Sequence, residues 1–373
     1  MISFPPEWKD LKVVLSHDWL TGMRGGERVL ELLCGGFPDA PVYSLLHNPG
    51  SVCETISRHR IETSCLQRVP GIFSKYRWFL PIFPWVIGRM HPPAADLLIS
   101  TSHCIAKGLK PAPGTKHLCY CFTPMRYAWI FYDEYFGKNP LKKALYKPVL
   151  KALREWDLKA SDRVDRFVAI SEHVRRRIKD CYGRAADVVY PPVDTDFYTP
   201  AGDPEDFDLI VSALVPYKRI DLAVMAYNHT GKKLKIVGIG TNDAELRRAA
   251  GPHIEFLGWQ DDAAVRDLYR RCRCLVFPGE EDFGIVPLEA QACGRPVVAY
   301  ARGGALETVV DGTTGVFFEN QKVDDLIAGI EKCHQTTWNP ASIRAHAEKF
   351  SRQHFIDGFA ESIRKCLAEP AGL

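Results

Sequence analysis

The chain has 373 residues, which is long for one ordinary domain and predicts two. A hydrophobic content of 46% and a charged content of 25% are ordinary for a globular protein and exclude a disordered or fibrous one. The net charge of +3 is too small to indicate a nucleic-acid-binding protein. We also expect neither a membrane-spanning helix nor a signal peptide, since no apolar run is long enough and the first residues lack a cleavable leader pattern.

Short β-branched segments alternate with longer amphipathic ones along the whole chain. Their apolar runs lack strict alternation, which is typical of parallel strands covered on both faces. The expected strands are 11–17, 96–102, 116–122 and 165–171 in the first half, and 208–214, 233–240, 253–259, 274–279 and 295–301 in the second. The pattern predicts an α/β protein with two doubly wound, Rossmann-like domains.

The domain boundary is expected between residues 188 and 208, where prolines and acidic residues interrupt the periodicity. This gives an N-terminal domain over 1–190 and a C-terminal domain over 191–351. The amphipathic stretch 352–373 is expected to form a helix that packs back on the first domain. Because ligands of open parallel sheets bind outside the carboxyl ends of the strands, we expect an active site in a cleft between the two domains.

The segment EEDFGIVPLEAQACG (280–294) follows one expected strand and carries Glu281 and Glu289. Pro287 suits the first turn of a helix and Gly294 its C-terminal end, so a helix is expected between them. Backbone amides just before that helix would bind an anion between the two carboxylates. The arrangement predicts a site for a sugar, a diphosphate and a ribose. The alternative is a solvated helix start whose carboxylates interact with the helix dipole.

This segment, with GRPVVAYARGGALETVVDGTTGVFF (294–318), resembles the family 4 glycosyltransferases, which are retaining, metal-independent enzymes of the two-domain GT-B fold. The resemblance covers nearly the whole chain. Further matching segments are HDWLTGMRGGERVLELL (17–33), ISEHVRRRIKDCYG (170–183), YPPVDTDFYTP (190–200), LVPYKRIDLAV (214–224) and LKIVGIGT (234–241).

TPMRYAW (123–129) and VPYKRID (215–221) are most similar to the branch that makes bacterial surface polysaccharides. That branch commonly transfers mannose from GDP-mannose. The resemblance therefore implies a mannosyltransferase that acts on a lipid-linked saccharide and needs no cofactor. A UDP-sugar donor, or a non-catalytic protein that binds nucleotide sugars, are the alternatives.

The resemblance also implies roles for individual residues of the second domain. Glu281 would bind the hydroxyls of the donor sugar, Glu289 the ribose, and Lys218 the diphosphate, where negative charge develops when the glycosidic bond breaks. The remaining residues expected on the donor side are Phe283, Gly284, Ile285, Gly238 and Gly240. Gly238 and Gly240 alone are a weak signal, because the third glycine of a dinucleotide-binding fingerprint is missing.

Two positions depart from the family pattern. Many relatives have an arginine where this chain has Ala213, so Arg219 is the candidate to replace that cation; a structural arginine is the alternative. Surface-polysaccharide relatives often have a histidine where this chain has Phe122.

The first domain contributes the remaining candidates. His103 follows a strand and is expected to approach the donor sugar as a catalytic residue; capping the following helix is its alternative role. On the acceptor side or in a phosphate loop we expect His17, Asp18, Gly25, Gly26 and Arg126, and on the donor side Ser171.

No metal site is expected. The aspartates of DTD (194–196) follow two prolines in the connection between domains, where such residues commonly form local turns. The closely spaced cysteine pairs Cys119/Cys121 and Cys272/Cys274 do not have the C-x-x-C spacing of a zinc or redox site and are expected to be buried free thiols.

The segment 64–95 has no acidic residue but several cations and aromatic side chains, namely Arg68, Lys75, Arg77, Arg89, Trp78, Phe79, Phe83 and Trp85. This composition suits the interface of an anionic membrane. We therefore expect a cytoplasmic protein, peripheral on the inner face of the plasma membrane. Packing within the protein or against the acceptor is the alternative role for this segment.

Overall fold

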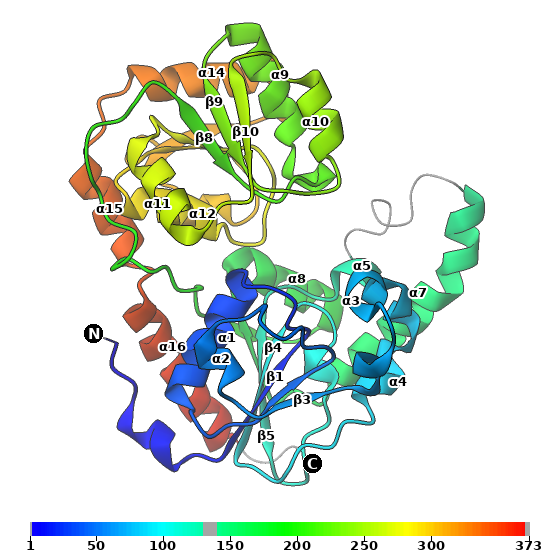
Figure 1. Cartoon of the computed structure of the whole chain (residues 1–373). Coiled ribbons are helices and arrows are strands. Elements are labelled where there is room, and N and C mark those ends of the chain that lie inside the picture. Colours follow the sequence, from blue (N-terminus) through cyan, green and yellow to red (C-terminus); the bar gives the residue numbers. More distant parts are fainter. Residues whose placement is uncertain (1, 130–139, 370–373) are drawn as a thin grey trace. The chain divides into compact units, whose positions relative to one another are not determined.

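A computed structural model describes residues 2–129 and 140–369 of the chain (Figure 1). The chain divides into two compact units. Unit 1 comprises the residues up to Pro191 and those from Phe355 on, and unit 2 comprises Pro192–His354. Each unit contains one sheet of parallel strands, as predicted for an α/β protein with two Rossmann-like domains.

The sheet of unit 1 has seven strands in the order β3-β2-β1-β4-β5-β6-β7. They are β1 (Val13–His17), β2 (Val42–Ser44), β3 (Ile61–Thr63), β4 (Leu97–Ser102), β5 (Lys116–Cys121), β6 (Arg166–Ala169) and β7 (Ala186–Val188). The described helices are α1 (Gly25–Gly36), α2 (Glu54–Ser57), α3 (Ile72–Lys75), α4 (Phe83–Ile87), α5 (Arg126–Trp129), α7 (Pro140–Ser161), α8 (Glu172–Tyr182) and α16 (Arg352–Ala368), with the 3-10 helices η1 (Pro6–Asp10), η2 (Cys65–Arg68), η3 (Tyr76–Ile82) and η4 (Ala106–Gly108).

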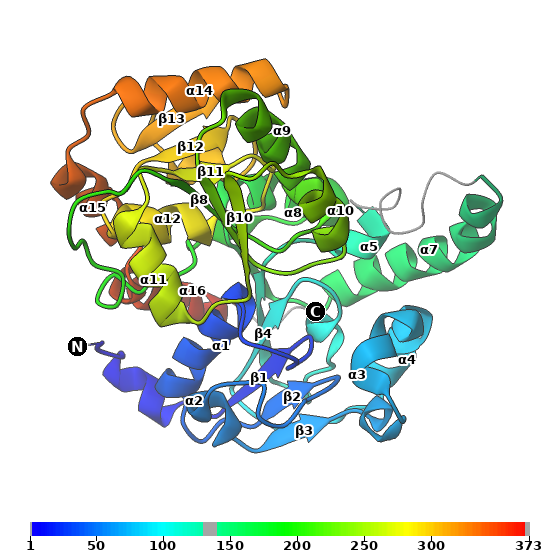
Figure 2. The ribbon, with the colours of Figure 1, turned by 45° about the horizontal axis from the view of Figure 1, so that its top comes forward.

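Helices cover both faces of this sheet, which is why β1 and β4 are buried along their whole length. Val14 and Leu98 pack in one buried cluster with side chains of η3 and α4, among them Tyr76 and Phe83. Figure 2 shows α1 and α2 on the other side of the sheet from α3 and α4. In α16, the rings of Phe355 and Phe359 pack against the buried ring of Tyr120 in β5.

The sheet of unit 2 has six strands in the order β10-β9-β8-β11-β12-β13. They are β8 (Asp208–Val211), β9 (Leu234–Val237), β10 (Ile254–Gly258), β11 (Leu275–Phe277), β12 (Val297–Tyr300) and β13 (Gly315–Phe318). The helices are α9 (Ile220–Thr230), α10 (Asp243–Ala249), α11 (Asp262–Arg271), α12 (Ile285–Ala292), α13 (Ala305–Thr308), α14 (Val323–Gln335) and α15 (Pro340–Glu348), with the 3-10 helix η5 (Pro216–Lys218). Figure 1 shows α9 and α14 on one face of the sheet and α11 and α12 on the other.

All nine predicted strands are present, and four further short strands were not predicted. β2, β3 and β7 have three residues each, too few to show a period, and β13 lies inside a segment that was read only as a family motif. The predicted burial of these thiols is confirmed, since all four cysteines of the two close pairs are buried and none of them is in a disulfide.

The segment 64–95 folds into η2, α3, η3 and α4 and leaves large apolar side chains exposed. Trp78 is 81% exposed and Trp85 is 54% exposed, while Arg89 lies over the Trp85 ring at 4.1 Å. Within residues 2–129 and 140–369, no helix combines the length and the apolar character needed to cross a membrane.

Candidate active site

The strand order of unit 2 reverses between β8 and β11, the place where open α/β sheets bind their ligands. The chain leaves β8 into the loop that ends at Lys218, and it leaves β11 into the loop that contains Glu281. The Lys218 ammonium and the Glu281 carboxylate form an ion pair across this point. Their side chains are 14% and 20% exposed, so the pair is accessible from solvent.

Glycines let the backbone pack closely around this ion pair. A Cβ atom at Gly279 would lie 2.8 Å from the Cα atom of Lys218, and one at Gly303 would lie 2.4 Å from the carbonyl oxygen of Glu281. Both distances are too short for any side chain. The loops after β8, β11 and β12 therefore hold the lysine and the glutamate in place through backbone contacts.

Pro287 lies in the first turn of the helix after Glu281, as predicted, although the helix begins at Ile285. Gly284 has φ +102° and precedes the first helical residue, Ile285, so that α12 spans Ile285–Ala292. Pro287 is the third residue of α12, where its missing N–H breaks no intrahelical hydrogen bond. Gly294, with φ +76°, follows the helix end.

Glu289 lies in α12, partly exposed, and is positioned by a residue that sequence analysis did not single out. The hydroxyl of Tyr269, a fully buried residue of α11, donates a hydrogen bond to Glu289 Oε2 at 2.9 Å. Burial, together with the neighbouring charge of Glu289, raises the pKa of Tyr269 well above its usual value, so this phenol remains a donor.

Gly238 and Gly240 follow β9 and allow close backbone packing. A Cβ atom added at Gly238 would lie 1.8 Å from the carbonyl oxygen of Ser212. A Cβ atom added at Gly240 would lie 2.1 Å from the carbonyl oxygen of Leu214. Two adjacent loops at the carboxyl edge thus require these glycines, whether or not a phosphate binds there.

Arg219 directly follows Lys218. Among the residues that the structure describes, it is the one non-glycine residue with a positive φ, which is 54°. Its guanidinium donates to the carboxylate of Asp221 and to Gln321 Oε1, the latter at 3.0 Å. The structure therefore brings Lys218 to Glu281 but directs Arg219 to Asp221 and Gln321. Ala213 is exposed in the loop after β8.

The strand order of unit 1 reverses between β1 and β4. Asp18 follows β1 and His103 follows β4, and Asp18 Oδ2 lies 2.7 Å from His103 Nδ1. The Asp18 carboxylate is fully buried and accepts hydrogen bonds from the four backbone N–H groups of residues 103–106. Burial opposes a charge on Asp18, but the charge and hydrogen bonds of His103 hold the pKa of Asp18 well below its usual range.

His17 is held by two residues that sequence analysis did not single out. Its Nδ1 lies 2.7 Å from Thr101 Oγ1, and its Nε2 lies 3.7 Å from the carboxylate of Glu27. Burial opposes the charge of Glu27, but the hydrogen bond and charge of His17 lower the pKa of Glu27. No local pattern indicates these partners, because Thr101 and Glu27 come from β4 and α1.

Phe122 packs beside both histidines. Its ring centroid lies 6.4 Å from that of His17 and 6.5 Å from that of His103. A Cβ atom at Gly26 would lie 3.3 Å from the Phe122 ring, so the glycine makes room for this ring. The structure thus brings His17, Asp18, Gly26 and His103 together around Phe122.

The other candidates of unit 1 lie at helix starts. Gly25 is the first residue of α1, and half-buried Arg126 is the first residue of α5, after β5. Ser171 follows β6, two strands from β4, and its hydroxyl accepts from the Val174 N–H at the start of α8. Ser171 therefore caps helix α8 and does not belong to the group that His17, Asp18 and His103 form around Phe122.

The aspartates of residues 194–196 are part of the structure of unit 2. Asp194 accepts hydrogen bonds from the guanidinium of Arg352 and from the Phe197 N–H. This pairing fits the local turn expected there.

Two family models together match residues 23–350. "Glycosyltransferase Family 4" matches residues 23–197, and "Glycosyl transferases group 1" matches residues 197–350. The solved structure of Anabaena HepE in complex with UDP and glucose superposes with a TM-score of 0.72 and 17% identity over 95% of this chain and 99% of that one. This chain is a family 4-like protein with the GT-B fold. The predicted fold class is thereby confirmed.

Curated relatives of this family 4-like chain are similar over part of their length. An uncharacterized glycosyltransferase of Methanocaldococcus jannaschii is 27% identical over 56% of this chain and 61% of its own length. The D-inositol 3-phosphate glycosyltransferase of Rhodococcus erythropolis is 30% identical over 54% of each chain. The chain thus spans between half and two thirds of the length of these relatives.

Proposed function

We propose that the protein is a retaining hexosyltransferase that uses a nucleoside diphosphate sugar as donor. The Lys218–Glu281 pair at the switch point of unit 2 carries this proposal. It puts a cation and a hydroxyl-binding carboxylate side by side, beside the N-terminus of α12, where backbone amides favour an anion.

In the proposed reaction the bond between the anomeric carbon and the diphosphate oxygen breaks, and the electron pair stays on the diphosphate. Lys218 stabilises this charge, and a preorganised group of this kind contributes about 3 kcal/mol to transition-state stabilisation. Glu281 binds sugar hydroxyls, and Glu289, held by Tyr269, binds the ribose. The leaving phosphate takes the proton of the acceptor hydroxyl, which attacks from the same face. No divalent metal is needed, because the lysine supplies the charge.

Unit 1 is proposed to supply the acceptor side. Asp18 holds His103 by its Nδ1, which leaves Nε2 to contact sugar or acceptor hydroxyls. His17, Gly25, Gly26 and Arg126 would complete this surface.

For the donor we propose GDP-mannose, on the resemblance of residues 123–129 and 215–221 to surface-polysaccharide mannosyltransferases. A UDP-sugar is the second candidate, because HepE, which shares this fold, has been solved with UDP and with UDP-glucose. A thermal-shift panel of GDP-, UDP- and ADP-sugars distinguishes them, since a ligand that binds only the native state raises the melting temperature. GDP-mannose is expected to give the largest shift; a larger shift with UDP-glucose would replace the donor assignment.

Donor hydrolysis without acceptor tests whether the protein is an enzyme. Wild-type protein is expected to hydrolyse the stabilising donor slowly, without added divalent metal, and Glu281→Ala to lose this activity while keeping the wild-type melting temperature. Full activity in Glu281→Ala would reject the site. Binding without turnover under any condition would indicate a non-catalytic protein.

We further propose a lipid-linked saccharide acceptor and a peripheral position on the inner face of the plasma membrane. Trp78 and Trp85 are exposed in a segment that has four cations and no acid. Wild-type protein is expected to float with anionic vesicles, and Trp78→Ser to float less. Trp259→Ser, which removes a tryptophan of unit 2 that is 71% exposed, is the matched control. Equal flotation of all three proteins, or none, would contradict membrane docking through this segment.

A further inference from the structure

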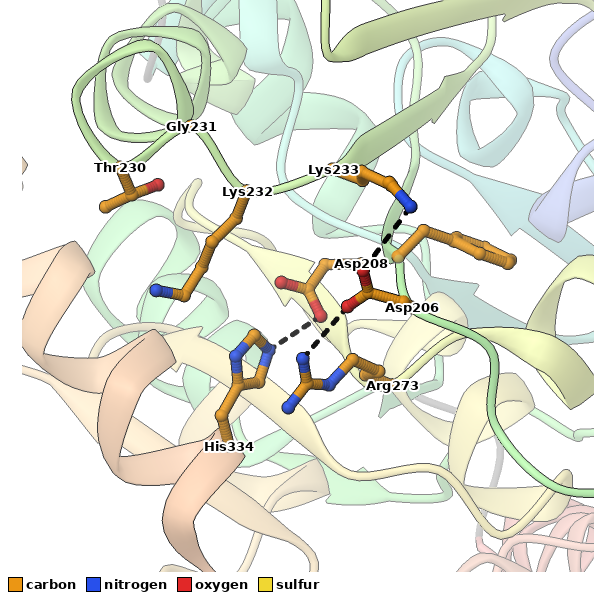
Figure 3. Close-up of a pocket in the computed structure, with 9 residues that line it drawn as sticks. Asp206, Asp208, Thr230, Gly231, Lys232, Lys233, Arg273 and His334 are labelled. Atoms are coloured by element: carbon orange, nitrogen blue, oxygen red, sulfur yellow. Dashed lines mark hydrogen bonds and ion pairs between the residues drawn. The ribbon is translucent and has the colours of Figure 1, made fainter.

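A second group of chemically reactive side chains lies at the other end of the unit 2 strands. Asp208 is the first residue of β8, Cys274 directly precedes β11, and His334 lies in the last turn of α14. Asp208 and His334 border a pocket at the amino ends of the strands (Figure 3), and the fully buried Cys274 lies behind them. Lys218 and Glu281 follow the carboxyl ends of the same two strands, so this group is separate from the proposed donor site.

The three side chains present one oxygen, one sulfur and one nitrogen to a common point. Asp208 Oδ1 lies 2.8 Å from His334 Nε2 and 3.2 Å from Cys274 Sγ, and Cys274 Sγ lies 4.0 Å from His334 Nε2. Among residues 2–129 and 140–369, these three form the one group of at least three His, Cys, Asp or Glu side chains that could hold a metal ion. Their ligand atoms all lie within 4.8 Å of one another. Zinc bonds of about 2.0–2.3 Å in a tetrahedral site require ligand atoms roughly 3.3–3.6 Å apart. Two of the observed separations are shorter than this range and one is longer, so small side-chain shifts must accompany zinc binding.

We propose that Asp208, Cys274 and His334 form a zinc site. Thiolate and imidazole together favour zinc over magnesium or calcium, which prefer oxygen ligands. A carboxylate and a thiolate also balance the two charges of the ion. The site ties the C-terminal end of α14 to the amino ends of β8 and β11 and therefore stabilises unit 2.

The carboxylate is already oriented for this role. The hydroxyl of the fully buried Tyr227 donates to Asp208 Oδ2 at 2.6 Å, which leaves Oδ1 directed at Cys274 and His334. Groups that fix a metal ligand in this way raise metal affinity, and their loss typically costs about 10–100-fold. Cys333, next to His334, places a second buried thiol within hydrogen-bonding range of Cys274.

The pocket leaves room for a fourth ligand, a water molecule. Two of its basic side chains, Lys233 and Arg273, pair with Asp206, at 3.4 Å and 3.2 Å, and Lys232 also borders the pocket. Figure 3 shows Asp206 between these two cations, with Asp208 and His334 paired beside it.

Binding requires two proton movements. Zinc replaces the thiol proton of Cys274, which leaves to solvent, so affinity rises with pH. Before zinc binds, His334 Nε2–H donates to Asp208 Oδ1; on binding this proton moves through solvent to Nδ1, which frees the Nε2 lone pair, so the hydrogen bond is exchanged for two bonds to the metal.

The test uses the full chain without an affinity tag, stripped with a chelator and titrated with Zn²⁺ or Co²⁺. Wild-type protein is expected to bind one equivalent, to show the near-ultraviolet charge-transfer band of a cobalt–thiolate bond, and to melt at a higher temperature with zinc. Cys274→Ser is expected to lose the charge-transfer band and at least about 100-fold in zinc affinity. His334→Gln is expected to lose at least about tenfold.

Matched controls separate metal binding from general damage to the core. Cys272→Ser removes a thiol that is also fully buried and lies two residues before Cys274, and His253→Gln removes another partly buried histidine of unit 2. Both controls are expected to bind zinc as the wild type does. The proposal is overturned if wild-type protein binds no stoichiometric metal, or if Cys274→Ser retains the charge-transfer band. Neither result bears on donor binding, which the nucleotide-sugar panel measures separately.

Discussion

The switch points of the two units use the same topology but very different environments. In unit 1, Asp18 and His103 pair across the reversal of strand order, and the carboxylate is fully buried and bound by four backbone amides. In unit 2, Lys218 and Glu281 pair across the equivalent reversal, but the Glu281 carboxylate is 20% exposed and that of Asp18 is not exposed at all. The Asp18 carboxylate is therefore built into the fold, whereas Lys218 and Glu281 can exchange each other for a ligand.

This difference has a physical consequence. Replacing a fully buried, hydrogen-bonded carboxylate such as that of Asp18 leaves unsatisfied groups and costs several kcal/mol, whereas an ion pair that solvent reaches contributes about 1 kcal/mol or less. We therefore expect substitution of Asp18 to affect stability and substitutions of Lys218 and Glu281 to affect catalysis.

The largest effect is expected from Lys218→Met. Losing a preorganised cation next to the leaving diphosphate is expected to lower turnover by about 100- to 1000-fold, because charge then develops without compensation. The melting temperature is expected to change little. Lys349→Met, at an exposed lysine of unit 2, is the control and should retain wild-type turnover. Steady-state kinetics decide, and unchanged turnover in Lys218→Met would remove the basis of the proposed mechanism.

Asp18→Asn is expected to lower the free energy of unfolding by about 3 kcal/mol, measured by urea denaturation, since an amide cannot accept all the hydrogen bonds that the carboxylate accepts. Glu281→Gln, the corresponding change in unit 2, is expected to cost about 1 kcal/mol or less. Equal losses in the two variants would show that the environments of the two pairs do not differ as described.

The stability difference between wild type and Asp18→Asn is also expected to depend on pH. The pKa of Asp18 is depressed in the folded state, so its contribution is present above about pH 4, the ordinary pKa of an aspartate, and is lost as the pH falls below that value. The expected slope is about 1.4 kcal/mol per pH unit below pH 4. Urea denaturation at several pH values between neutral and acidic measures it; a difference that stays constant would rule out the depressed pKa.

The smallest effect is expected from Tyr269→Phe. This change removes the hydrogen bond that positions Glu289 and is expected to weaken nucleotide binding by about threefold to tenfold, corresponding to roughly 0.5–1.5 kcal/mol. Tyr300→Phe, in β12, is the control. Titration calorimetry compares the two variants, and equal affinities would show that Tyr269 does not support the ribose site.

The amino-acid sequence by itself determined the elements and the chemical types of residue at the strand ends. Apolar runs are a local property, so nine of the strands and the α/β class could be predicted, and the Glu281–Glu289 segment carried its family resemblance in consecutive residues. The exact first residue of α12 was not predicted, because it depends on the positive φ of Gly284.

Only the tertiary structure decided which distant side chains meet. Asp18 and His103, Lys218 and Glu281, and Asp208, Cys274 and His334 come from segments far apart in the chain. The strand order brings the first two pairs together, and the packing of α14 adds His334 to the third group. The three-residue strands likewise exist because neighbours supply their hydrogen bonds. Local patterns cannot specify such contacts, since the free energy that forms them comes from packing and pairing between elements.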